Sequence, residues 1–202
     1  MTSSLYGASA EYALHSLLIL AARTEPVAVR DLARFQKLPE RFLAKLFTRL
    51  KKAGIVEGIE GSRGGFVLAR VPARISVLDV LSAIDPDRSL FECAEIRRNC
   101  DLFEGEPSAW SAAGTCRIHL VMQEAEAALH GFLSAKTLDD LGREFEHKAP
   151  KRFLGASEQW FQSCRRERNG SQADKDGGGC AKRKTCATGK DCKISPKIKS
   201  HE

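Results

Sequence analysis

The sequence has no hydrophobic stretch long enough to cross a membrane. Its longest apolar run covers residues 13–22, whereas a membrane-spanning helix needs about 20 consecutive apolar residues. The run also lacks the basic segment that precedes the core of a signal peptide, because Glu11 stands before it and His15 lies within it. We therefore expect a cytoplasmic protein with no membrane partner, in which this run forms a buried helix.

The sequence also lacks the residue combination of a cysteine-dependent enzyme. No Cys–His pair has a third polar group placed to orient it, as nucleophilic catalysis requires. Seven cysteines are nevertheless present among the 202 residues. In a reducing compartment this number favours metal ligation or redox chemistry over a disulfide framework. We therefore expect that the protein is not an enzyme and that its cysteines are ligands or a redox switch.

Positive charge is concentrated in two segments of the chain. Residues 21–70 carry eleven Lys or Arg against five Asp or Glu, and residues 143–202 carry fifteen against eight, within a formal net charge of +6. Basic segments on a mixed background favour a polyanionic partner, and nucleic acid before a membrane surface. We therefore expect double-stranded DNA as a partner if the basic residues share one face of the fold.

Residues 29–68 have the pattern of a winged helix-turn-helix. A short amphipathic helix over 29–35 is followed by a tight connection and by a second helix that begins at Pro39 and ends before Gly54. The second helix has an apolar stripe at helical spacing: Phe42, Leu43, Leu46, Phe47 and Leu50. Two short strands around the Gly-rich run 60–65 then predict a β-hairpin, the wing.

The polar face of the second helix and the wing supply the predicted DNA contacts. Residues early in a recognition helix meet base edges, and later basic residues meet phosphates. The predicted base contacts are Glu40, Arg41, Ala44 and Lys45, and the predicted phosphate contacts are Arg49, Lys52 and Arg63. The alternative is that these charges form only the solvated side of an amphipathic helix.

The rest of the chain predicts a mainly α fold with four parts. Residues 1–85 form the winged helix-turn-helix domain, which ends with a helix over 76–84 capped by Ser76. Residues 86–115 lack periodicity and form a cysteine-containing sensor loop. Residues 116–142 contain a long helix whose apolar positions repeat every three or four residues, which favours a homodimer, and a short helix over 137–141. Residues 143–202 are predicted to be a mostly disordered basic tail.

The residues of the winged helix resemble the IscR/NsrR/RsrR family, also called the Rrf-two family. The similarity is carried by KLFTRLKKAGIV (45–56) in the second helix and by GSRGGFVL (61–68) in the wing. EYALHSLLILAA (11–22) and ISVLDVLSAID (75–85) are similar to the family's neighbouring helices, so the resemblance covers roughly residues 5–142. It implies a dimeric transcription factor, and many members bind an iron–sulfur cluster that changes their DNA affinity.

The resemblance implies that three cysteines are cluster ligands. Cys93, Cys100 and Cys116 match the family's cysteine region in order and position, although the fifteen residues between Cys100 and Cys116 exceed the usual gap. Iron–sulfur clusters usually take four ligands, so another residue must complete the set.

The resemblance implies two ways in which the ligand set of the cluster could be completed. His119, in the run CRIH, is similar to a ligand of IscR-like members. Glu11 and His15 are similar to RsrR-like members, in which a Glu and a His of the partner complete a two-iron cluster held by two cysteines. A 2Fe–2S cluster is therefore favoured over a 4Fe–4S cluster.

Four further cysteines, Cys164, Cys180, Cys186 and Cys192, lie in the C-terminal part, where few apolar residues could support a rigid site.

We expect a regulator, in the first place a repressor, that senses redox state, iron or nitric oxide. The alternatives are the same fold without a cluster, with the cysteines as a thiol switch or zinc site, and a protein-interaction module that does not bind DNA.

Overall fold

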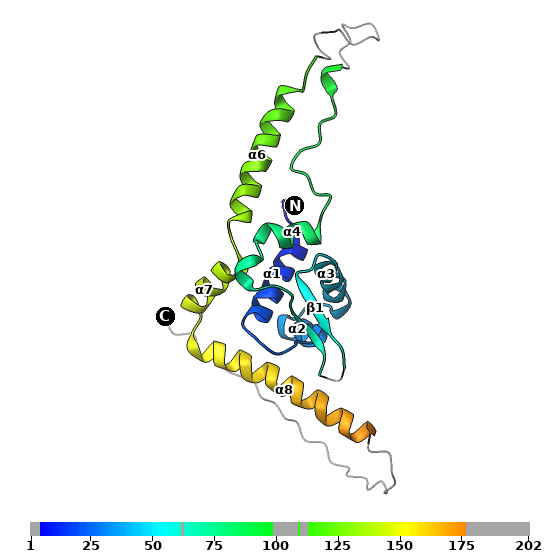
Figure 1. Ribbon diagram of the computed structural model, residues 1–202, viewed down its shortest axis with the longest axis vertical. Coiled ribbons are helices and arrows are strands. Elements are labelled where there is room, and N and C mark those ends of the chain that lie inside the picture. The colour runs from blue at the N-terminus through cyan, green and yellow to red at the C-terminus, as the bar shows by residue number, and fades with distance from the viewer. Residues whose placement is uncertain (1–4, 62, 99–108, 110–112, 177–202) are drawn as a thin grey trace.

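The computed structural model describes residues 5–61, 63–98, 109 and 113–176, and it confirms the predicted mainly helical winged helix-turn-helix (Figure 1). Its elements are α1 (Ala8–Ala21), α2 (Val29–Gln36), α3 (Glu40–Lys52), β1 (Val56–Ile59), β2 (Gly65–Leu68), η1 (Pro72–Arg74), α4 (Val77–Ile84), η2 (Ile96–Arg98), α6 (Arg117–Ser134), α7 (Leu138–Lys148) and α8 (Lys151–Asp176). Within the described residues, no helix combines the length and the apolar character that crossing a membrane requires.

The core surrounds α1, which contacts α3, α4 and α7. The predicted stripe of the second helix is confirmed, since Leu43, Leu46, Phe47 and Leu50 are buried. Fully or almost fully buried side chains from the other elements complete this core: Leu17, Leu32, Ile55, Ile75, Val80 and Leu138. Burial of such side chains is the main source of stability in a domain of this size, and it fixes the position of α3 relative to α1 and α2.

The turn between α2 and α3 contains a strained residue. Lys37 ends α2 in the left-handed conformation, with a φ of 56° and a ψ of 41°, a region that favours glycine. The next amide, that of Leu38, donates a hydrogen bond of 2.9 Å to the carbonyl of Ala33 and closes the helix end. The helix α3 then begins at Glu40, one residue later than predicted. Pro39 has an extended ψ of 121° and is therefore the N-cap residue, which precedes the first helical residue.

The wing is the antiparallel pair of β1 and β2, with Val56 opposite Leu68 and Ile59 opposite Gly65. It is attached to the core through Phe66, whose amide and carbonyl both bond to Val27 and whose ring lies 5.0 Å from that of Phe47. A Cβ at Gly65 would lie 2.5 Å from the carbonyl of Val27, so this close approach requires glycine.

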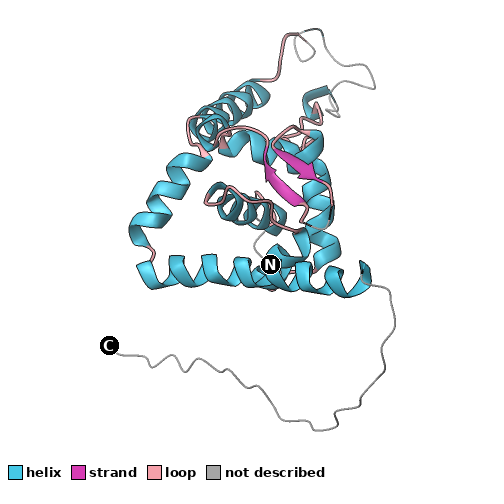
Figure 2. Cartoon of the chain, turned by 60° about the horizontal axis from the view of Figure 1, so that its bottom comes forward, coloured by secondary structure: helices cyan, strands magenta, loops and turns pink. Residues whose placement is uncertain are grey.

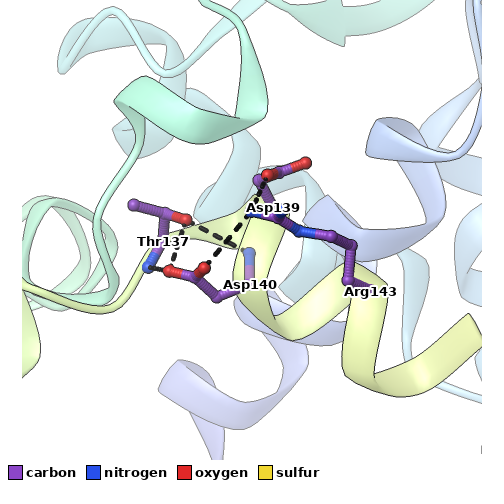
Figure 3. A network of polar contacts seen from close by, with 4 residues as sticks. All are labelled: Thr137, Asp139, Asp140 and Arg143. Carbon is purple, nitrogen blue, oxygen red and sulfur yellow. Dashed lines mark hydrogen bonds and ion pairs between the residues drawn. The ribbon is translucent and has the colours of Figure 1, made fainter. Parts of the chain in front are cut away.

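Capping boxes begin both α4 and α7. Ser76 caps α4 as predicted, through a hydrogen bond of 3.0 Å from the amide of Asp79. Thr137 and Asp140 make the same exchange at α7, and Arg143 pairs with Asp140 at 3.4 Å (Figure 3). The backbone and side-chain hydrogen bonds from Thr137 lower the pKa of Asp140. The helix α7 continues to Lys148, beyond the predicted 137–141, and ends just before Pro150.

The C-terminal part differs most from expectation. The predicted disorder of residues 143–202 does not hold for residues 151–176, which form α8 (Figure 2). The ring of Phe35 in α2 lies 5.1 Å from that of Trp160 and 4.9 Å from that of Phe161. The segment contains few apolar residues, and the contact of Trp160 and Phe161 with α2 is what stabilises it as a helix. The prediction for residues 177–202, with Cys180, Cys186 and Cys192, lies outside the described residues.

Candidate nucleic-acid interface and cysteine site

The outer face of α3 and the wing tip form the candidate nucleic-acid interface. The seven predicted contacts are all exposed: Glu40, Arg41, Ala44, Lys45, Arg49, Lys52 and Arg63. Arg41, Lys45 and Arg63 take part in none of the ion pairs formed in the described part of the chain. Their charges are therefore available to a polyanion, as phosphate or base contacts require.

Arg49 differs from the other basic residues of this face. Its Nη1 donates a hydrogen bond to the carbonyl oxygen of Ile84, the last residue of α4. The predicted phosphate contact thus has a partner inside the protein. Helical periodicity shows which face of α3 is polar, but it cannot show that the end of α4 lies against that face.

One further residue of this surface was not predicted. Thr48 is exposed on α3, and its hydroxyl donates to the carbonyl of Ala44 at 3.0 Å. Arg30 in the first turn of α2 is exposed as well, but it pairs with Asp31 at 3.7 Å, and burial together with the charge of Arg30 lowers the pKa of Arg168, so Arg30 lies toward α8.

The cysteine site lies at the beginning of α6, where Cys116 is the N-cap residue. The backbone amides of His119 and Ile118 lower the pKa of the Cys116 thiol, and smaller contributions come from Arg97 and from a side-chain hydrogen bond with Cys93. A helix N-terminus favours the thiolate through these amides. The structure therefore brings together two of the three predicted cysteine ligands.

Polar contacts hold the segment around Cys93 in place. The Sγ of Cys93 lies 3.7 Å from Oε1 of Glu95. Arg97 donates to Oε2 of Glu95 at 2.9 Å and to the carbonyl of Ala113 at 3.3 Å. Arg97 therefore joins the segments on either side of residues 99–112, and its charge favours thiolates nearby.

His119 follows Cys116 by one helical turn and lies beside this site. Its ring centroid is 6.2 Å from that of Phe91. Its Nδ1 is buried and has no hydrogen-bond partner among the described residues. A buried ring nitrogen without a partner is unusual, and it leaves His119 free to bind or to hydrogen-bond a group at this site.

The other predicted ligands are not gathered here. Glu11 and His15 are both exposed on α1, near the centre of the molecule, whereas the first turn of α6 lies at its far end (Figure 1). Cys100 lies outside the described residues. Within the described residues, no three His, Cys, Asp or Glu side chains form a metal-binding group. Cys164 is buried in α8, and burial raises the pKa of its thiol.

The chain is similar to known transcriptional regulators. Residues 6–144 match the family model Rrf2, described as an iron-dependent transcriptional regulator. A relative from Aquifex aeolicus (strain VF5), which carries the name of an HTH-type transcriptional regulator, is 30% identical over 138 residues, 68% of this chain and 90% of that protein. The HTH-type transcriptional regulator IscR of Escherichia coli (strain K12 / DH10B) is 28% identical over 152 residues, 69% of this chain and 87% of that protein.

A solved structure shows the same fold. The global cysteine regulator CymR (YrzC) of B. subtilis superposes with a TM-score of 0.54 and 22% identity, covering 71% of this chain and 98% of that chain. The family match ends within α7, so α8 lies beyond the part of the chain that the family model describes.

Proposed function

Because the chain belongs to the Rrf2 family of transcriptional regulators, we propose that it is a repressor whose affinity for its operator is set by an iron–sulfur cluster at the cysteine site. The observation that carries the proposal is the neighbouring position of Cys93 and Cys116 at the N-terminus of α6, on a fold whose recognition helix presents a basic face.

The basic face supports DNA binding in the manner of a helix-turn-helix. A helix fits the major groove, where the edges of all four base pairs can be distinguished. Arg41 and Lys45 lie on adjacent turns of the exposed face of α3 and would reach base edges, while Arg63 would reach a phosphate from the wing. Rigid packing of α3 through Leu43 and Phe47 supports the required orientation.

The exposed apolar face of α6 supports a homodimer. None of the side chains of this helix is buried, and Ile118, Val121 and Phe132 are 64%, 47% and 62% exposed. An apolar groove of about 790 Å³ lies beside the C-terminal half of α6, and its lining includes Tyr6, Leu14, Val77, Leu81 and Leu133. We propose that a second copy covers these surfaces, since burial of apolar area is the main driving force for such association.

The residues of the site suit an iron–sulfur cluster. Thiolates are its natural ligands, and the lowered pKa of Cys116 favours the thiolate. The described residues supply two sulfur ligands, and further ligands would come from Cys100, from His119 or from Glu11 and His15 of the partner subunit. The last set would give two cysteines, a Glu and a His, which fits a two-iron cluster. The cluster would supply a redox-active centre, while Arg97 and Glu95 would hold the Cys93 segment against α6.

Anaerobic purification tests the cluster. The expected product is coloured, contains iron and acid-labile sulfide, and loses its visible absorbance in Cys93→Ser and Cys116→Ser. The matched control is Cys164→Ser, which lies in α8 and should keep the colour. A colourless, iron-free protein from anaerobic cells would contradict the proposal.

A thiol switch without a cluster is the second candidate. It is supported by the hydrogen bond between Cys116 and Cys93, since neighbouring thiols with a lowered pKa are suited to form a disulfide. Mass spectrometry under non-denaturing conditions distinguishes the two: a loss of two hydrogens on mild oxidation indicates the disulfide, whereas a mass increase from bound iron and sulfide indicates the cluster.

A further inference from the structure

Arg49 of α3 caps the C-terminal end of α4, the neighbouring helix. The last carbonyls of a helix have no intrahelical partner, and positive charge is favourable there. The last turn of α4 contains no basic residue, and its C-cap is the acidic Asp85. Arg49 of α3 supplies the missing donor and the missing charge through its hydrogen bond to Ile84.

The chain that leaves α4 at this point leads directly to the cysteine site. Asp85 pairs with Arg88 at 3.2 Å, and the amide of Leu90 donates to Oε1 of Glu126 at 3.0 Å. Since Glu126 belongs to α6, the segment 85–93 is held by α3 at its beginning and by α6 before it reaches Cys93. The recognition helix and the cysteine site are thus linked through the segment 85–93, which hydrogen bonds attach to α3 at one end and to α6 near the other.

We propose that Arg49 is a positioning residue that couples DNA binding to the state of the cysteine site. The proposal rests on the proposed DNA-binding function, and it assigns two alternative partners to one guanidinium. Without DNA, Arg49 binds the carbonyl of Ile84. When a phosphate approaches the exposed face of α3, the same group turns to the phosphate, because a charge-assisted hydrogen bond to an anion is stronger than one to a carbonyl.

This exchange of partners gives the coupling its physical basis. Loss of Arg49 leaves the end of α4 without its donor, so the segment 85–93 is freed and the surroundings of Cys93 change. Linkage is reciprocal: a change at Cys93 that moves the segment alters the availability of Arg49 to DNA. The two positions of Arg49 are the two-state element that such a connection needs.

The test measures the labelling of Cys93 by iodoacetamide, with and without a duplex selected from a random pool, at a duplex concentration that saturates each variant. In the wild-type protein the duplex is expected to change the labelling rate about fivefold or more. Arg49→Gln should abolish this change. Lys52→Gln is the matched control, because Lys52 is exposed on the same helix and should lose only phosphate affinity while keeping the duplex effect.

A second variant acts from the other end of the connection. Glu126→Ala removes the contact with Leu90 and lies outside the DNA interface, so it should still bind the duplex and yet abolish the duplex effect on Cys93. The coupling is overturned if the duplex leaves Cys93 labelling unchanged in the wild-type protein, or if Arg49→Gln and Glu126→Ala keep the full effect. The labelling is done on iron-free protein, in which the thiol of Cys93 is not a cluster ligand, so the failure of the coupling is distinguishable from the failure of the cluster proposal.

Discussion

Arg168 of α8 forms an ion pair with Asp31 of α2, and their side chains are only 12% and 3% exposed. The pair joins the C-terminal helix to the first helix of the helix-turn-helix. Burial, together with the nearby charge of Arg30, lowers the pKa of Arg168. Two further contacts attach α8 to the domain. Arg23 donates a hydrogen bond of 2.8 Å to the hydroxyl of Ser157, and Nη1 of Arg34 lies 3.9 Å from Oε2 of Glu167. The helix α8 is therefore bound to the DNA-binding domain along much of its described length.

Arg168→Gln is expected to destabilise the protein. Removing Arg168 leaves the buried carboxylate of Asp31 with only the half-exposed Arg30 as a partner, at 3.7 Å, which costs on the order of 1–3 kcal/mol of unfolding free energy unless α8 detaches. Urea unfolding measures this free energy. The control is Arg166→Gln, because Arg166 is exposed on the same helix and should change stability by less than about 0.5 kcal/mol. Equal midpoints for the two variants would show that α8 does not depend on this pair.

Lys37→Gly is expected to stabilise the protein by roughly 1 kcal/mol, because glycine adopts the left-handed conformation at no steric cost. Thermal and urea unfolding both measure the gain. Lys37→Ala removes the same side chain but keeps a Cβ, so its stability should remain close to that of the wild-type protein. A similar gain in both variants would mean that the lysine side chain, and not the backbone strain, is the unfavourable feature.

Cys116 is expected to react with iodoacetamide at lower pH than Cys164. The amides of His119 and Ile118 lower its pKa, so the reactive thiolate is populated at a pH below the ordinary value of 9.0. Burial raises the pKa of Cys164 and also blocks access to it. Labelling rates of the two thiols over a pH series, resolved by peptide mass spectrometry, check the order. The opposite order would contradict the assignment of Cys116 to the helix N-terminus.

Lys45→Gln and Arg63→Gln separate the two kinds of DNA contact. Loss of the phosphate contact of Arg63 should weaken binding to all duplexes alike and reduce the salt dependence by about one unit of slope. Loss of the base contact of Lys45 should cost about 1–3 kcal/mol for the selected duplex and less for unrelated ones. Binding isotherms at several salt concentrations measure both, and identical losses on every duplex would exclude base recognition by Lys45.

The winged helix was predictable because its signals are local. The apolar spacing from Phe42 to Leu50, the cap at Ser76 and the Gly-rich wing each follow from a few consecutive residues, and the structure contains all three. The spacing of the cysteines in the sequence identified only some of the residues that come together at the site. Cys93 and Cys116 are neighbours because the segment before Cys93 is attached to α6, whereas Glu11 and His15 lie on α1, away from them in the single chain.

Local sequence signals alone define α1 to α4, α6, the wing and the basic face, since periodicity and capping act between residues a few positions apart. Packing between distant segments is what makes residues 151–176 a helix bound to α2, pairs Asp31 with Arg168, and brings Arg49 to the end of α4. These outcomes depend on side chains far apart in the chain, and their stability comes from burial and charge pairing that exist only once the helices have packed.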